Sequence, residues 1–209
     1  MSNEKEEIEF KWEAKSVTDF DVFFDSLKKY SKKFTAPLSM IQNDYYIDTT
    51  NFDFLNKKVA LRIRQVNQKF CLDFKYGQIL EKGFVKRTEG RIKLNSETLT
   101  DCLEEIENME NILNVQPNNL QILFEIKNNR TIREFFIDEG HCFEVCFDDF
   151  TVSSPDHKTE SKKEIELEIK TSDETYFNNL VEKITKTSNL KPATSSKFKT
   201  GLKLIGKEI

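Results

Sequence analysis

The chain has 209 residues, of which 33% are charged and 18 are phenylalanine. This length allows one domain or at most two, and it is enough to bury a hydrophobic core. The 32 basic and 36 acidic side chains give a net charge of -4, which does not favour a nucleic-acid partner held by a basic surface. No apolar run approaches the roughly 18 residues needed to cross a membrane, and the polar first residues do not form a signal peptide. We therefore expect a soluble cytoplasmic protein.

Charged and bulky apolar residues alternate without a break near the amino terminus, from Glu7 to Trp12. Because successive side chains of a strand point to opposite faces, Glu7, Glu9 and Lys11 would share one face and the apolar residues between them the other. A single run of this kind is also typical of an edge strand with a solvated face.

The alternation recurs further along the chain, in segments 60–64, 72–75, 85–89 and 163–169. The last segment is the clearest, because Glu164, Glu166 and Glu168 alternate with three aliphatic residues. If these charged faces look outward, the chain is a barrel with an apolar interior and a charged surface. If they look inward, the barrel holds a polar tunnel, and helices must cover its apolar outer face. Periodicity alone does not choose between the two arrangements.

The first helix is predicted after Thr18, which can cap it. Asp21, three residues later, can complete a capping box with Thr18. Aromatic and aliphatic residues then recur at helical spacing from Phe20 to Phe34, and Pro37 closes the segment. Such a one-sided helix needs an apolar surface on which to lie.

Two further amphipathic helices are predicted: one starts at 96–99 and stops near Pro117, and the other is capped by Ser172. Besides the three helices, the chain contains about eight strand candidates in hairpin-like succession. They do not follow a repeating βαβ order. In one of them the alternation slips by one residue at Asn128-Asn129, which we interpret as a bulge. Helices with wide apolar stripes need an apolar surface to cover, and a barrel with apolar residues inside would not offer one. They therefore favour the arrangement in which the charged faces look inward. The expected fold is therefore α+β, an eight-stranded antiparallel β-barrel around a tunnel with amphipathic helices on its outside, in a single domain spanning 1–209.

The number and spacing of the cysteine, histidine and glycine residues exclude several kinds of functional site. The four cysteines have no metal-ligand or redox spacing, so we expect packed thiols at Cys71, Cys102, Cys142 and Cys146. Two histidines do not support a Ser-His-Asp or Cys-His arrangement. Because there is no glycine-rich phosphate loop, side chains would have to hold any phosphate.

Taken in chain order, the charged positions form a specific series. It consists of Glu7-x-Glu9-x-Lys11, Tyr46-x-Asp48-Thr49, Leu61-Arg62-Ile63-Arg64, Lys75, Arg87-x-Glu89, Arg130, Asp148, Glu164-Ile165-Glu166-x-Glu168 and Ser196-Lys197-Phe198. This series resembles the CYTH superfamily, the triphosphate tunnel metalloenzymes, over nearly the whole chain. The resemblance implies an eight-stranded antiparallel barrel whose tunnel binds a triphosphate through basic residues and a divalent metal through carboxylates.

The resemblance also implies roles for individual residues. The expected triphosphate-binding residues are Lys11, Arg62, Arg64, Lys75, Arg87, Arg130 and Lys197. The expected catalytic and metal-binding residues are Glu7, Glu9, Glu164, Glu166, Glu168 and Asp148, with Glu89 in support. Arginine offers bidentate contacts to phosphate oxygens, and hard carboxylate oxygens suit Mg²⁺ or Mn²⁺. Turn chemistry explains Tyr46, Asp48 and Thr49, which we interpret as structural.

Some positions depart from the family pattern. Asp73 stands where a neutral residue is more typical, which would weaken phosphate binding locally, and Phe198 stands where tyrosine is common. The irregular alternation leaves open whether Lys127 or Arg133 joins Arg130 in the tunnel.

The resemblance implies a metal-dependent hydrolase that releases the terminal phosphate of a small triphosphate, with inorganic tripolyphosphate as the expected substrate. Alternatives are a thiamine triphosphatase, a class IV adenylyl cyclase, and a non-catalytic module that binds polyphosphate or nucleotide. The inward carboxylates favour an enzyme over an anion binder. No residues are committed to a purine, and the His-x-Phe signature of the bacterial cyclases is missing after the first strand. We expect a monomer or homodimer without a membrane or nucleic-acid partner, and an RNA 5′-triphosphate stays open as a substrate.

Overall fold

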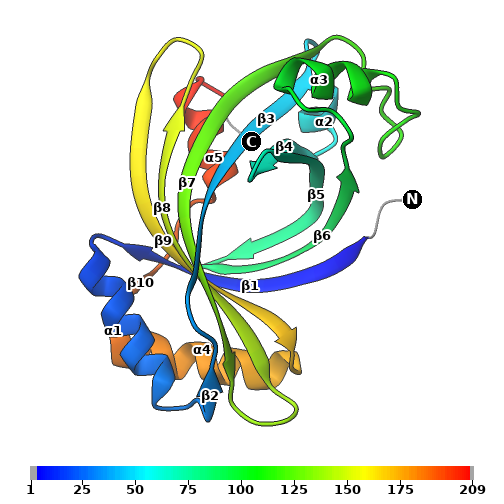
Figure 1. Cartoon of the computed structure of the whole chain (residues 1–209). Helices are drawn as coiled ribbons and strands as arrows, with labels where there is room; N and C mark the ends of the chain where they lie inside the picture. Colours follow the sequence, from blue (N-terminus) through cyan, green and yellow to red (C-terminus); the bar gives the residue numbers. More distant parts are fainter. Residues whose placement is uncertain (1–3, 208–209) are drawn as a thin grey trace.

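The computed structural model describes residues 4–207, apart from the side chains of 78–80. Eight long strands close into an antiparallel barrel (Figure 1). Their order around the barrel is β1 (Lys5–Ala14), β6 (Phe84–Lys93), β5 (Lys69–Glu81), β4 (Ala60–Val66), β3 (Leu38–Thr49), β7 (Leu120–Phe136), β8 (Cys142–Ser153) and β9 (Thr159–Thr171). Pairing of β9 with β1 closes the barrel. The predicted fold class is confirmed.

Shorter elements complete the described part of the chain. Strand β2 (Lys33–Phe34) pairs with β7, and β10 (Lys191–Pro192) pairs with β1. The helices are α1 (Val17–Lys28), α2 (Asp53–Asn56), α3 (Leu99–Glu107), α4 (Glu174–Ser188) and α5 (Lys197–Leu204). Over residues 4–207, no helix combines the length and the apolar character that a membrane crossing requires.

Strand β1 shows which face of the sheet lies inside. Glu7, Glu9 and Lys11 are buried within the barrel, whereas Phe10 and Trp12 belong to a hydrophobic cluster on its outside. Helices α1 and α4 cover that cluster (Figure 1), and the Trp12 indole N–H donates to Thr185 Oγ1 of α4 at 2.8 Å. The charged faces therefore look inward, as the wide apolar stripes of the helices indicated.

Helix α3 covers a second part of the outer surface. Its buried residues Cys102 and Ile106 pack in one cluster with Ile63 of β4 and Leu72 of β5. The apolar side of α3 thus covers a strand face that would otherwise be exposed to water, which explains the amphipathic pattern of this segment.

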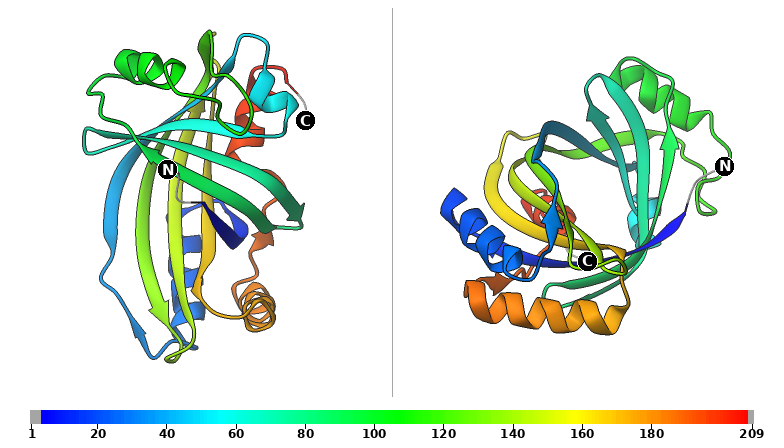
Figure 2. Two further views of the ribbon diagram at one scale, coloured as in Figure 1. Left: turned by 90° about the vertical axis from the view of Figure 1, so that its right-hand side faces the viewer. Right: turned by 60° about the horizontal axis from the view of Figure 1, so that its bottom comes forward.

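Helix α5 differs from the other helices because it packs within the curve of β7, β8 and β9 (Figure 2). Leu202 of α5 lies in a cluster with Phe124 of β7 and Phe150 of β8. Lys197, in the first turn, is buried among carboxylates of the barrel interior. The three helices expected on the outside, α1, α3 and α4, pack there, whereas α5 is an additional helix that the sequence pattern did not predict.

The first helix begins and ends earlier than its pattern predicted. Ser16, not Thr18, is the N-cap, and it forms a capping box with Asp19 in place of Asp21. The helix ends at Lys28, and Phe34 lies in β2. Aromatic residues continue beyond the helix because β2 contributes to the same cluster, so the apolar spacing did not mark the helix end.

The caps of the later helices follow hydrogen-bond geometry. Thr98 caps α3, and its hydroxyl accepts from Asp101 N; α3 then stops at Glu107, well before Pro117. Asp173, not Ser172, caps α4, because its carboxylate accepts from Tyr176 N.

Strand β7 is continuous, and the bulge predicted at Asn128-Asn129 is absent there. Asn128 pairs regularly with Gln42 of β3 and with Phe150 of β8. The irregularity in β3–β7 pairing instead lies between Tyr46 and Ile47.

Gly201→Ala tests the packing of α5 in the barrel. Alanine usually stabilises a helix interior by about 1 kcal/mol relative to glycine. Here, however, a Cβ atom would lie 2.1 Å from the Phe124 ring. We expect a net loss of about 1–3 kcal/mol in the free energy of unfolding, measured by urea denaturation. Gly140→Ala, whose Cβ would meet no atom closer than 3.6 Å, is the control and should change little. Equal stability of both variants would contradict the packing of α5 described above.

Candidate functional site

The barrel encloses a cavity of about 450 Å³. Most of the predicted site residues line it: Glu7, Glu9, Lys11, Arg62, Arg64, Lys75, Arg87, Arg130, Glu166, Glu168 and Lys197. Asp148 and Glu164 are buried directly beside these residues and contact Lys197. Glu89 contacts Lys75 at 3.0 Å. The structure thus brings the whole predicted set together.

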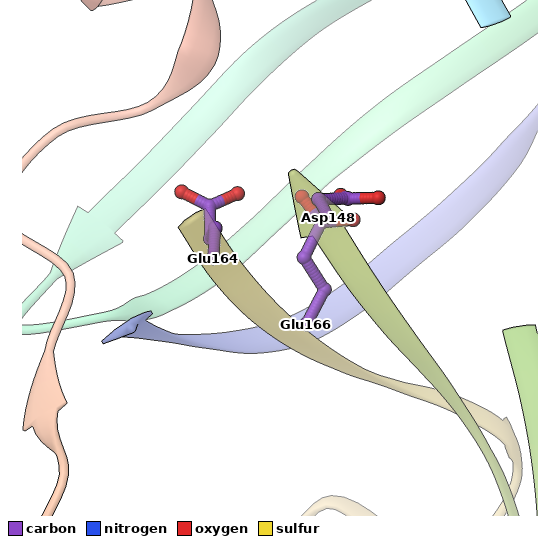
Figure 3. Close-up of side chains that lie close together, drawn as sticks. All are labelled: Asp148, Glu164 and Glu166. Atoms are coloured by element: carbon purple, nitrogen blue, oxygen red, sulfur yellow. The ribbon is translucent and has the colours of Figure 1, made fainter. Parts of the chain in front are cut away.

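Three buried carboxylates gather where β8 and β9 run side by side (Figure 3). One oxygen atom from each of Asp148, Glu164 and Glu166 lies within 4.8 Å of the others. Burial, together with the neighbouring Glu166, raises the pKa of Glu164. The pKa of Glu166 is instead held well below its usual range, because Lys11, Lys197 and Arg130 outweigh the effect of its burial. This compact set of hard oxygen donors fits a divalent cation.

Cations surround this carboxylate triad. The Lys197 ammonium lies 2.8 Å from Asp148, 2.6 Å from Glu164 and 2.8 Å from Glu166. Arg130 donates to both oxygens of Asp148, at 2.7 and 2.6 Å, and to Glu166 at 2.6 Å. Lys11 contacts Glu166 as well. Buried carboxylates are thereby matched by buried positive charge, as desolvation requires.

A second group of charges lies on β1, β5 and β6. Arg87 donates to Glu7 and, through Nη2, to Glu9 at 2.7 Å. Lys75 lies 3.1 Å from Glu7. Burial would raise the pKa of Glu7, but Lys75, Arg87 and Lys11 hold it well below its usual range. Glu7 is therefore ionised at neutral pH and paired with two cations of the wall.

A third group contains Asp73, noted above as a departure from the family pattern, and Asp44, which the sequence analysis missed. Arg64 donates from Nε and Nη2 to Asp44 at 2.7 and 2.8 Å, and Arg62 donates to Asp44 at 3.0 Å. Arg62 also donates to Asp73 at 2.5 Å, and Asp73 accepts two further bonds from Arg91. Asp44 lies two residues before the inward Tyr46 in β3, so the alternation of this strand is the signal that could have identified it.

Neither Lys127 nor Arg133 of β7 joins Arg130 in the barrel interior. Lys127 is exposed, and the Arg133 guanidinium lies 4.5 Å from the centre of the Phe24 ring, outside the barrel. Asn128 takes the inward position and donates to Asp148 at 2.9 Å. Continuous pairing of β7 keeps Asn128 and Arg130 on one face, which the assumed bulge had obscured.

The Tyr46-x-Asp48-Thr49 segment combines two roles. Asp48 is structural, as expected, since its carboxylate accepts from the backbone N–H groups of Thr49, Phe54 and Leu55. Tyr46 is not a turn residue: it lies in β3, lines the cavity and stacks on Phe198 with ring centres 5.2 Å apart.

All four cysteines are free, and Cys102 and Cys146 are buried, in line with the expected packed thiols. Burial raises the pKa of Cys71 and of Cys102 to about 11, so both thiols stay protonated near neutral pH.

Comparison with known proteins places these features in context. The family model described as CYTH domain matches residues 5–202. A search of curated proteins found no significant match. A solved Hippeastrum protein, described as an adenylyl cyclase candidate with a dominant triphosphatase activity, has 21% identity and a TM-score of 0.61, covering 97% of both chains.

Two further solved structures are similar. An adenylate cyclase candidate from Bacillus halodurans has 18% identity and a TM-score of 0.62, covering 94% of this chain and 97% of its own. The Mimivirus capping enzyme triphosphatase has 12% identity and a TM-score of 0.53, covering 88% of this chain and 90% of its own. At these identities the likeness establishes a shared fold.

Asp44→Asn tests the buried arginine pair. Burial favours the neutral carboxyl group, but Arg62 and Arg64 outweigh this and lower the pKa of Asp44 to about 2. A depressed pKa stabilises the fold above the unfolded-state value of about 4, and this stabilisation is lost as pH falls towards 2. We expect the variant to lose about 3 kcal/mol at pH 7 and to show a shallower stability decrease between about pH 5 and 2.

Urea denaturation at several pH values would measure this effect. Asp25→Asn, at an exposed aspartate of α1, is the control and should follow the wild type. If Asp44→Asn and wild type lost stability in parallel on acidification, Asp44 would not carry the assigned ion pairs.

Proposed function

Because the chain belongs to the CYTH domain family, we propose that it is a divalent-metal-dependent hydrolase of triphosphates that releases the terminal phosphate, with inorganic tripolyphosphate as its main substrate. The observation that carries this proposal is the buried Asp148–Glu164–Glu166 triad in direct contact with Lys11, Arg130 and Lys197. Donors for a metal and donors for phosphate thus meet at one place.

The basic residues account for binding of the substrate. A triphosphate is an extended polyanion, and its transfer into a buried cavity requires matching positive charge. In this proposal, the binding residues are Lys11, Arg62, Arg64, Lys75, Arg87, Arg130 and Lys197. An arginine guanidinium group can donate two parallel hydrogen bonds to the oxygens of one phosphate group. The four arginines therefore favour binding of phosphate over binding of a monovalent anion.

The carboxylates account for the metal. Glu7, Glu9, Glu164, Glu166, Glu168 and Asp148 would hold Mg²⁺ or Mn²⁺, and Glu89 would support Lys75. A bound divalent ion supplies charge neutralisation at phosphate oxygens. Carboxylates that take such an ion no longer need lysine and arginine partners, which leaves those cations free for phosphate.

Hydrolysis needs little beyond this arrangement. Phosphoryl transfer depends mainly on positioning and on electrostatic stabilisation of the charge on the transferred group. Lys197 and Arg130, which already reach the triad, are placed to stabilise the terminal phosphoryl group. The many inward carboxylates argue against a pure anion-binding module, which would have no use for them.

A substrate panel tests the proposal. With Mg²⁺ or Mn²⁺, we expect orthophosphate from tripolyphosphate, slower release from ATP and thiamine triphosphate, and no cyclic AMP. Removal of the metal with EDTA should abolish release. Malachite-green detection of phosphate and chromatography of nucleotides would measure the products. Cyclic AMP as the main product from ATP would identify a cyclase, and absence of turnover on every substrate would favour a binding module.

Glu166→Gln tests the triad itself. This change removes a metal donor while nearly preserving shape, so kcat for tripolyphosphate should fall about 100-fold or more. The fold should persist at some loss of stability, because Lys11 keeps Glu9 as a partner, and Arg130 and Lys197 keep Asp148. Glu182→Gln on the exposed face of α4 is the matched control. Full activity of Glu166→Gln at saturating metal would remove the triad from the mechanism.

A further inference from the structure

A second cavity, of about 440 Å³, lies beside the first. The ends of β1 and β9 line it, together with the segment 193–195 that joins β10 to α5, and Thr200 of α5. In Figure 1, β10 and α5 run along this side of the barrel. Of the site residues proposed above, only Glu164 lines this space.

Ion pairs of Glu164 link the linings of the two cavities. Glu164 lines the second cavity. Its Oε1 atom accepts from Lys197 at 2.6 Å and lies 3.6 Å from the Lys11 ammonium. Both lysines line the first cavity. Glu164 and its two lysine partners therefore lie at the boundary between the two spaces.

The lining of the second cavity is polar. Hydroxyl groups come from Ser161, Thr194, Ser195 and Thr200, ammonium groups from Lys15, Lys162 and Lys163, and carboxylates from Glu13 and Glu164. The half-exposed Lys162 ammonium donates to Thr200 Oγ1 at 3.3 Å and contacts Glu160 at 2.9 Å. Hydroxyls and an ammonium are the donors that a tetrahedral phosphate requires.

The direction of the reaction relates the two cavities, and this step rests on the proposed function. In hydrolysis of a terminal phosphoryl group, water attacks in line with the leaving pyrophosphate, from the opposite side. If the pyrophosphate part lies among Arg62, Arg64 and Lys75, the terminal phosphorus lies at Lys11 and Lys197. The opposite side is then the side of Glu164, where the second cavity begins.

We propose that the second cavity is the route by which water reaches the terminal phosphate and orthophosphate leaves. The water oxygen forms a bond to the terminal phosphorus while the bond from that phosphorus to the bridging oxygen breaks. The bridging oxygen keeps the electron pair and leaves as pyrophosphate. One proton of the water passes to solvent, and orthophosphate is left facing Glu164. Lys162 and the hydroxyl groups then receive it, while pyrophosphate returns through the first cavity.

Blocking the second cavity tests this route. Thr194→Trp and Ser161→Trp place a large ring at exposed positions of its lining. We expect kcat for tripolyphosphate to fall about tenfold in each variant, with unchanged KM and melting temperature. Thr187→Trp, at an exposed position on α4, is the matched control and should leave kcat unchanged. Wild-type kcat in both blocking variants would overturn the route.

Binding of orthophosphate provides a test that does not need turnover. In EDTA-treated protein saturated with tripolyphosphate, ³¹P NMR should detect bound orthophosphate, and Lys162→Met should weaken this binding about tenfold. Orthophosphate that binds only when tripolyphosphate is absent would overturn the proposal, as would binding that Lys162→Met leaves unchanged. If the protein did not hydrolyse tripolyphosphate, the proposed function would fail, yet this measurement would still decide whether the second cavity takes phosphate.

Discussion

Buried charges of opposite sign, paired inside the barrel, are the interaction on which the rest of this structure depends. Lys197, Arg130 and Arg87 are buried or nearly so, and each contacts two or more carboxylates. Removal of such charges from water costs several kcal/mol for each ion unless a partner compensates. Since the inner face of the sheet is charged, its apolar face lies outside, and α1, α3 and α4 must cover it.

The same pairing links stability to the proposed chemistry. Every predicted phosphate-binding cation has a carboxylate partner in this structure, from Lys11 with Glu166 to Arg64 with Asp44. In our proposal, the metal replaces the lysines and arginines as partner of the carboxylates, and the triphosphate replaces the carboxylates as partner of the lysines and arginines. The interior therefore gains no uncompensated charge. Asp44 and Asp73 accept hydrogen bonds from Arg62 and Arg64 and thereby position these two arginines in the wall.

Helix α5 joins the fold to the site. Gly201 allows the helix to lie against Phe124, and Lys197 then reaches the carboxylate triad from the first turn. Glu164 of β9 contacts this lysine and lies at the boundary of the two cavities. A change in the packing of α5 is therefore expected to alter the site as well as stability.

The sequence by itself determined which side chains share a strand face, because the period of two in β1 and β9 is local. Only the tertiary structure decided that α5 enters the barrel, that Asn128 replaces Lys127 and Arg133 at the lumen, and that Asp44 holds two arginines. These outcomes depend on sheet closure and on pairing between strands far apart in the chain. Local spacing does not record which cation meets which carboxylate, because that choice is made by the register of neighbouring strands.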